Sequence, residues 1–178
     1  MTTSPKLVAG DSFPIIKADL LDGSSIQLGA AQGEATWQMV IVYRGVHCPL
    51  CTRYLNILEE FKVQLSEIGV DIVAISADSK QQLQTHSEQL DVTYPVAYGL
   101  TEDQMKQLGL YISMPRSEKE TDHNFAEPGL FIVNEQGNVQ AVDISNTPFL
   151  RPEISVVLRG LTFVRNQDDY PIRGTLSY

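Results

Sequence analysis

The chain has 178 residues, of which 43% are hydrophobic and 20% are charged, and it carries a formal net charge of −9. This composition is ordinary for a globular protein, and the length predicts a single domain over residues 1–178 with a substantial core. The negative charge argues against a general binder of nucleic acid or of anionic membranes, because phosphates repel such a surface.

The chain offers no targeting or membrane-spanning signal. Residues 1–10 lack the long apolar core of a secretory signal, and no stretch approaches the roughly 20 apolar residues of a membrane span. We therefore expect a cytoplasmic protein that does not bind membranes. Because the cytoplasm keeps thiols reduced, a cysteine pair there is expected to cycle rather than to form a permanent cross-link.

The first part of the chain predicts a hairpin, a strand and a helix. Residues 15–28 alternate in polarity around Asp22-Gly23, which is typical of a small β-hairpin. The nearly continuous apolar run at 37–43 predicts a strand buried on both faces. Apolar residues then recur at helical spacing over 48–68, and Gly69 can end that helix.

The middle of the chain predicts one further strand and two helices. Residues 70–77 form a second buried apolar run. Asp78 with Gln81, and Thr101 with Gln104, resemble capping boxes, each of which would start a helix.

The last part predicts a second hairpin and a final helix. Apolar residues at 130–133 and 139–144 flank a turn at 135–138, and Pro152 can open the final helix. The predicted inner face of this helix consists of Ile154, Val157, Leu158, Leu161 and Val164. Strands that alternate with helices indicate an α/β fold with a central mixed sheet and helices on both of its faces.

Both cysteines of the chain lie in one C-x-x-C motif, Cys48-Pro49-Leu50-Cys51, between a predicted strand and a predicted helix. In this context the motif indicates thiol–disulfide redox chemistry. We expect Cys48 at the helix N-cap and Pro49 at the first helical position, where a missing N–H is tolerated. Unsatisfied N–H groups and the helix dipole would then lower the pKa of Cys48, and Cys51, one turn further on, is placed to close an internal disulfide.

Alternatives to redox chemistry remain at this point. The two cysteines are inert, or they bind a metal, which would need two more ligands, whereas His86 and His123 form no short-spaced pair. Arg44 and Arg53 either add positive charge near the thiols or are ordinary solvated side chains. His47 either assists proton transfer or lines the loop.

Two segments have no clear period. Residues 111–127 are polar, and structureless loops of this length are uncommon unless they are functional or mobile. We favour a solvated loop there, with a rim over the active site as the alternative. Residues 166–178 pack either on the body of the protein or against a second subunit, so that a homodimer stays open.

The combined pattern resembles the peroxiredoxin-like (redoxin, AhpC/TSA) family of the thioredoxin-fold superfamily over most of the chain. The segments that carry the resemblance are, in order, 8–14, 21–23, 43–49, 74–79 and 128–134. The resemblance implies a thioredoxin-like fold with an N-terminal β-hairpin. It also implies thiol-based reduction of peroxides or protein disulfides.

The chain departs from the peroxiredoxin pattern at three positions. Peroxiredoxins place Thr or Ser three residues before the peroxidatic cysteine, proline four residues before that, and arginine just before the late strand. Here these positions hold Gly45, Ile41 and Pro128. Only the cysteine of that constellation is present, at Cys48.

The same positions favour a comparison with thioredoxin. Pro128 matches the cis-proline that packs against the disulfide in thioredoxin, with a plain turn proline as the alternative. His47 replaces the tryptophan usual before the first cysteine, and Pro49-Leu50 replaces Gly-Pro. The chain looks most like peroxiredoxin-like proteins that lie between the two families.

The resemblance implies a mechanism. The Cys48 thiolate attacks a peroxide oxygen or a disulfide sulfur, Cys51 resolves the product as an internal disulfide, and a thioredoxin or glutathione system resets the pair. No bound cofactor or metal is required. Pro128 shapes the substrate groove and keeps a bridging metal off the thiolates, and the other expected groove-lining or thiolate-supporting residues are Arg44, Gly45, His47 and Pro49.

Two functions of other classes stay open. One is a redox-sensing or partner-binding module with weak or no peroxidase turnover. The other is an interaction protein that retains the fold with inert cysteines.

Overall fold

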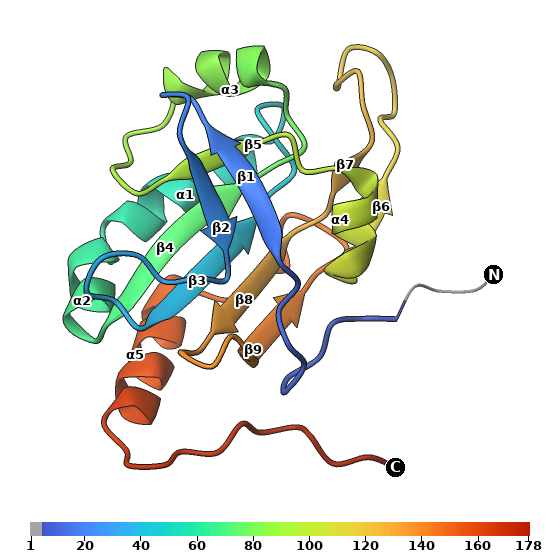
Figure 1. Cartoon of the computed structure of the whole chain (residues 1–178). Coiled ribbons are helices and arrows are strands. Elements are labelled where there is room, and N and C mark those ends of the chain that lie inside the picture. The colour runs from blue at the N-terminus through green and yellow to red at the C-terminus, as the bar shows by residue number, and fades with distance from the viewer. Residues whose placement is uncertain (1–4) are drawn as a thin grey trace.

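A computed structural model describes residues 5–178 (Figure 1). The first four residues of the N-terminal stretch considered above lie outside the described residues. In chain order the elements are β1 (Ile16–Leu20), β2 (Ser25–Leu28), β3 (Trp37–Val42), α1 (Pro49–Glu59), α2 (Lys62–Glu67), β4 (Val70–Ile75), α3 (Lys80–Ser87), β5 (Val96–Tyr98), α4 (Glu102–Gln107), β6 (Ile112–Ser113), β7 (Phe125–Ala126), β8 (Gly129–Val133), β9 (Val139–Ile144) and α5 (Ile154–Arg165).

Seven strands form one mixed sheet in the order β2-β1-β5-β4-β3-β8-β9. Strand β3, the fifth in this order, runs parallel to β4 and antiparallel to β8. The register pairs Val42 with Ile75 on one side and with Gly129 on the other, so the segments after β4 and before β8 both flank the chain where it leaves β3. The predicted α/β class, central mixed sheet and N-terminal hairpin are confirmed.

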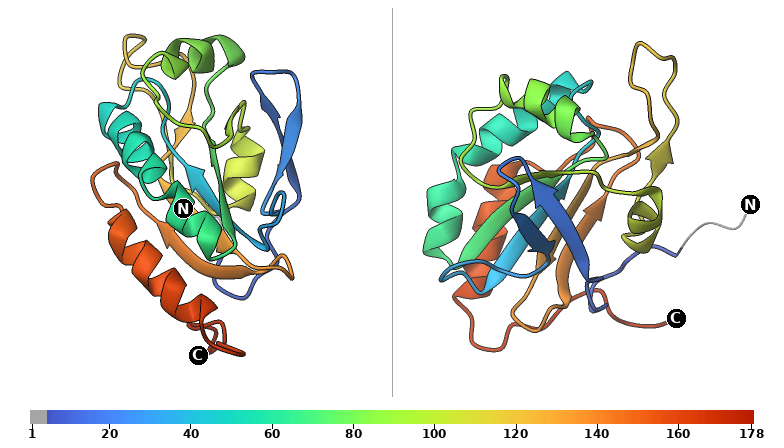
Figure 2. Two further views of the ribbon diagram at one scale, coloured as in Figure 1. Left: turned by 90° about the vertical axis from the view of Figure 1, so that its left-hand side faces the viewer. Right: turned by 45° about the horizontal axis from the view of Figure 1, so that its top comes forward.

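The sheet carries a hydrophobic core on each face, because successive side chains of a strand point to opposite sides. Met39 and Ile41 of β3 lie in the core that α1, α2 and α5 cover. Val40 and Val42 lie in the opposite core, which contains the side chains of the β1–β2 hairpin and of α4. The left view of Figure 2 shows α1, α2 and α5 on one side of the sheet and α4 on the other.

The helix predicted over 48–68 is two helices. The N–H groups of Glu60 and Phe61 bond to the carbonyls of Ile57 and Leu58, three residues back instead of four, which tightens and ends α1. The apolar period continues through this break into α2, so the sequence pattern alone shows one helix. The final helix likewise begins at Ile154 rather than at Pro152.

One predicted capping box is confirmed and the other is wrong by one residue. Thr101 and Gln104 cap α4 as expected. The cap of α3 is formed by Ser79 with Gln82, not by Asp78 with Gln81. The carboxyl of Asp78 is turned away from α3 and accepts a hydrogen bond from the backbone of residue 46 instead.

Strand β5 was not predicted, because its three residues between Pro95 and Gly99 are too few to show a period. It nevertheless joins β1 to β4 in the sheet. The C-terminal stretch is mostly exposed, and its contacts with the body include Tyr170 on the ring of Phe163 and Thr175 close to Gly10. Within the described part of the chain, none of the helices has the length and apolar character that a membrane crossing requires.

The fold generates a pH-dependence through His86 of α3, which is fully buried. Its Nε2 lies 2.8 Å from Thr52 Oγ1 of α1, and burial lowers its pKa to about 4. The folded form therefore binds fewer protons than the unfolded form between about pH 4 and the ordinary histidine pKa near 6.5, so stability is lost as the pH falls through this window.

We expect His86 alone to contribute a loss of about 2 kcal/mol in the free energy of unfolding between pH 7 and pH 5. Urea denaturation of the wild type and of His86→Gln at both pH values measures it. The variant should lose correspondingly less stability on acidification. Equal losses in the two proteins would show that His86 does not couple folding to protons.

Candidate active site

The two cysteines form a disulfide at the N-terminus of α1, with their Cα atoms 5.2 Å apart. Cys48 is the N-cap, and its Sγ accepts the backbone N–H of Cys51 at 3.3 Å, while Pro49 occupies the first helical turn. Both cysteines are buried, with Cys48 2% exposed, whereas Pro49 and Leu50 between them are exposed. The expected cap geometry is present, and access to the sulfurs is narrow.

The turn before Cys48 depends on a glycine. The N–H of Cys48 donates to the carbonyl of Gly45 at 3.1 Å, and Gly45 has φ +137°, a conformation that residues with a side chain rarely adopt. A Cβ atom at this position would overlap Oδ1 of Asp78 and lie 3.0 Å from its Cγ. The absence of the Thr or Ser expected for a peroxiredoxin therefore has a steric reason in this chain.

Asp78 is a site residue that sequence reasoning assigned to a helix cap. Its side chain is fully buried, and Oδ2 accepts the N–H of Val46 at 2.7 Å. Desolvation raises the pKa of this carboxyl, while the Val46 hydrogen bond opposes the shift. Its place beside the turn follows from the parallel register of β3 and β4.

The segment 111–127 forms a rim beside this site, and the expected solvated loop is present only at its tip, residues 116–119. Its ends pair as β6 and β7, and the ring of Phe125 is fully buried. The guanidinium of Arg44 lies 3.3 Å from Glu120 and 3.5 Å from Glu127, and it sits over the Phe125 ring. Arg44 is thus paired with two carboxylates of the rim and not with a cysteine sulfur.

His47 and Arg53 differ in their surroundings. The His47 ring packs against Phe125 with centroids 4.6 Å apart, and neither of its buried nitrogens has a hydrogen-bond partner among the described residues. Burial, followed by the charge of Arg44, lowers the pKa of His47 to about 4, so its ring is neutral at pH 7. Arg53 is exposed, as an ordinary solvated side chain.

Arg151 is the cation that reaches the cysteine pair, and the sequence analysis missed it. Its Nη2 donates to Sγ of Cys51 at 2.7 Å, and its Nε donates to the carbonyl of Pro148 at 3.1 Å. Its guanidinium stacks over the ring of Tyr54, whose hydroxyl donates to the carbonyl of Pro152. Burial lowers the pKa of Arg151 to about 10, which leaves it protonated at pH 7.

No sequence signal links Arg151 to the motif. The residue is 100 positions from Cys51 in the chain, in the connection between β9 and α5. The one local feature of Arg151 is that it directly precedes Pro152, just before the last helix.

Pro128 is buried directly before β8, and none of the peptide bonds in residues 5–178 is cis. The proposed match to the cis-proline of thioredoxin therefore does not hold. Pro128 lines a small void of about 10 Å³ together with Tyr54 and Arg151, which is too small for a substrate. It lies next to the residues that hold the disulfide, but not as a groove wall over the sulfurs.

An apolar groove of about 370 Å³ begins beside Arg151. Leu50, Tyr54 and Ile57 of the motif and α1 form one wall, and Phe149 forms part of the other. Phe149 is 72% exposed and Leu50 48% exposed, so large apolar side chains border the cysteine pair on the solvent side.

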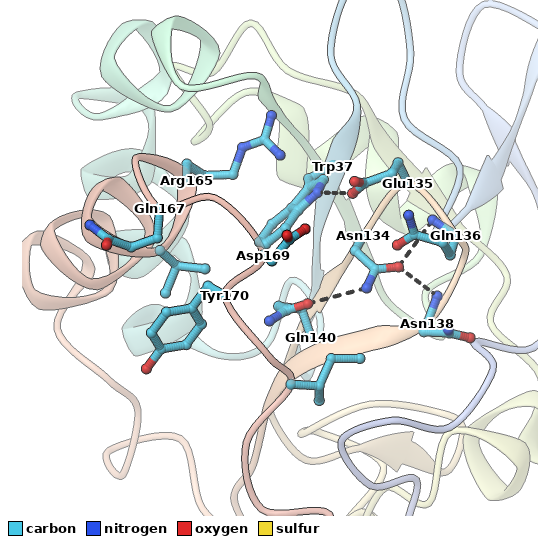
Figure 3. Close-up of a pocket in the computed structure, with 12 residues that line it drawn as sticks. Trp37, Asn134, Glu135, Gln136, Asn138, Gln140, Arg165, Gln167, Asp169 and Tyr170 are labelled. Carbon is cyan, nitrogen blue, oxygen red and sulfur yellow. Dashed lines mark hydrogen bonds between the residues drawn. The ribbon is translucent and has the colours of Figure 1, made fainter.

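A second cavity, of about 310 Å³, lies at the opposite end of β3 and is polar (Figure 3). Its polar groups bond among themselves, with Trp37 Nε1 donating to Glu135 and the Asn134 amide donating to Gln140 at 3.2 Å. The length of β3 separates this cavity from the cysteine pair. Among the described residues, no group of three or more His, Cys, Asp or Glu side chains is arranged to hold a metal ion.

The arrangement suits thiol–disulfide chemistry. A sulfur at a helix N-cap and a guanidinium on its partner sulfur both favour thiolates over thiols. The redox-spaced pair, rather than a single cysteine, allows an internal disulfide to form and to be reduced.

Several solved structures are similar to this chain. A peroxiredoxin-like protein from Aquifex aeolicus is 19% identical, with 90% of each chain covered and a TM-score of 0.73. Peroxiredoxin 6 of Arenicola marina is 19% identical over 88% of this chain and 72% of its own, with a TM-score of 0.73. Peroxidoxin BcpB from Mycobacterium tuberculosis is 15% identical over 89% of this chain and 98% of its own, with a TM-score of 0.72.

At these identities the likeness of the structures shows the fold. No curated protein sequence matches the chain. Residues 9–142, however, match the AhpC/TSA family. Since that match spans well over half of the chain and includes both cysteines, the protein belongs to the AhpC/TSA family.

Proposed function

We propose that this thiol-dependent oxidoreductase uses Cys48 as its nucleophile and Cys51 as its resolving residue. The observation that carries the proposal is the buried disulfide at the N-terminus of α1, with Arg151 on Sγ of Cys51. Cys48 is the residue at the helix cap, where N–H groups stabilise a thiolate, and it retains slight exposure. Cys51 is fully buried and therefore suited to an internal step.

A peroxide is the first candidate oxidant. The Cys48 thiolate attacks one peroxide oxygen, the O–O bond breaks, and the alkoxide leaves as an alcohol after protonation, so that Cys48 becomes a sulfenic acid. The Cys51 thiolate then attacks the Cys48 sulfur, and hydroxide leaves as water. A dithiol or two thiols of the reducing partner return the disulfide to the reduced pair.

A protein disulfide is the alternative oxidant at the same site. The Cys48 thiolate attacks one sulfur and releases the other as a thiolate, and Cys51 then displaces the remaining sulfur. Gly45 and Pro128 replace the hydroxyl and the arginine that bind peroxide in peroxiredoxins, so reaction with peroxide should be slower. This favours a protein disulfide as the oxidant. The exposed apolar groove beside the pair also favours a macromolecular partner, either as substrate or in a redox-sensing module.

The proposal includes a thiol reductant such as a thioredoxin or glutathione system, in a reducing compartment such as the cytoplasm. In such a compartment the internal disulfide is a transient product of turnover, because the thiol pool reduces it. No bound cofactor takes part in any of these steps.

The rate of oxidation by hydrogen peroxide tests the peroxide reaction. Fully reduced protein should lose two hydrogen atoms by intact mass, and it should react at least about tenfold faster than its thiolate fraction alone explains, because a peroxidase site also stabilises the charge that develops on the peroxide. A rate no higher than that of an ordinary low-pKa thiol would exclude the peroxidase and leave disulfide exchange or sensing.

The two cysteines should differ when each is replaced by serine. We expect Cys48→Ser to abolish redox activity and Cys51→Ser to accumulate a sulfenic acid or a mixed disulfide on Cys48, because the resolving thiol is missing. Peptide mapping after dimedone or thiol trapping locates the adduct. An adduct on Cys51 in the Cys48→Ser protein, with turnover retained, would reverse the two roles.

Arg151 should act on the resolving step. Arg151→Ala removes the hydrogen bond to Sγ of Cys51, so closure of the disulfide after oxidation of Cys48 should slow about tenfold, and Arg151→Lys should slow it less. Stopped-flow separation of the oxidation and closure phases measures this. Arg159→Ala, which removes an exposed arginine of α5, is the matched control. Equal closure rates in all four proteins would contradict the assignment.

A further inference from the structure

We propose that Asp78 is a positioning residue of the dithiol turn, residues 45–48. Its buried carboxyl fills the space of the side chain missing at Gly45 and holds the turn in the geometry in which Cys48 caps α1. The inference rests on the proposed role of Cys48 as nucleophile.

The first support is a short chain of hydrogen bonds. Oδ2 of Asp78 accepts the N–H of Val46 at 2.7 Å, and within the same turn the carbonyl of Gly45 accepts the N–H of Cys48 at 3.1 Å. The carboxyl thus fixes the middle of the turn whose last residue carries the reactive sulfur. Hydrogen bonds from a backbone N–H to a charged acceptor are about twice as strong as neutral ones.

The second support is steric. A Cβ at residue 45 would overlap Oδ1 of Asp78, so a side chain at Gly45 and the carboxyl of Asp78 cannot both be present in this geometry. The oxygen at the turn therefore belongs to Asp78, which follows β4, and not to a side chain at position 45. The residues at positions 45 and 78 thus constrain each other sterically.

The third support is the surroundings of the carboxyl. It faces Tyr43, directly after β3, Ser76, directly after β4, and His123 and Asp122 from the rim. Oδ1 is buried without a hydrogen-bond partner among the described residues, and it lies 3.6 Å from Nε2 of His123, whose Nδ1 lies 2.8 Å from Asp122. A fully buried carboxyl that contacts the turn, the strand and the rim links these three parts.

Two physical effects of Asp78 on Cys48 have opposite signs, which makes the role testable. As a nearby negative charge, Asp78 disfavours the Cys48 thiolate, so its removal would lower the thiol pKa. As a support of the turn, Asp78 favours the thiolate by keeping Cys48 at the helix cap, so its removal would raise the thiol pKa. The positioning role predicts the second result.

The test uses the Cys51→Ser protein, which has one thiol, and measures its alkylation by iodoacetamide from pH 5 to 10. Asp78→Ala should raise the pKa of Cys48 by about one unit and slow alkylation about tenfold at pH values below the pKa of the parent thiol. Asp78→Asn keeps an oxygen for the Val46 N–H and should stay within about threefold of the parent. Asp71→Ala is the control, because Asp71 is a half-buried carboxyl with a raised pKa at the opposite end of β4.

An unchanged or lowered Cys48 pKa in Asp78→Ala, or the same rise in Asp71→Ala, would overturn the proposal. Should Asp78→Ala fail to fold, Asp78→Ser, whose side chain is too short to keep the acceptor for the Val46 N–H, takes its place. Asp78→Ser should raise the Cys48 pKa by a similar amount, and an unchanged or lowered pKa in this variant would also overturn the proposal. Alkylation needs no oxidant, so these results stand whether or not Cys48 proves to be the redox nucleophile.

Discussion

The capping of α1 by a cysteine is the contact on which the rest of the site depends. Because Sγ of Cys48 accepts a backbone N–H of the first helical turn, the reactive sulfur lies in the positive field of a helix whose other face is buried in the core. The turn before Cys48 is tight, which requires Gly45. The residue after Cys48 is Pro49, whose missing N–H is tolerated at the first helical position. The strand β3 delivers this turn between the ends of β4 and β8, which supply Asp78 and Pro128, whereas Arg151 comes from the connection between β9 and α5.

The site keeps the cysteine of a peroxiredoxin while the supporting groups come from other places in the chain. The hydroxyl expected at position 45 is absent, and the carboxyl of Asp78 fills its space. The arginine expected before β8 is absent, and Arg151 from the connection before α5 reaches the sulfur of Cys51 instead. A cation on the second sulfur rather than the first fits a pair that closes an internal disulfide better than it fits a single peroxidatic cysteine.

The sequence predicted the elements that have a period and the contacts that lie close along the chain. The sheet strands of six residues, both hairpins, the cap of α4 and the cysteine pair at the start of α1 were all predictable from local pattern. The break between α1 and α2 was not, because the apolar spacing of Phe61 and Leu65 continues across it. Arg151, Asp78 and the rim contacts of Arg44 depend on strand register and on side chains 30 to 100 positions apart, which no local pattern encodes.

Of the cations near the cysteine pair, Arg151 is the one that contacts a sulfur, Sγ of Cys51. The chain is strongly acidic, and the nearest arginine in sequence, Arg44, is held by two rim carboxylates. His47 precedes Cys48 directly, yet burial keeps its ring neutral at pH 7. Arg151 is therefore the charged group left to stabilise a thiolate, and because it stacks on Tyr54 of α1 its distance to Cys51 is fixed by the same helix that Cys48 caps. Nucleophile and resolving thiol thus lie at the start of α1, and the cation is packed against the same helix, so their relative geometry does not depend on the exposed groove.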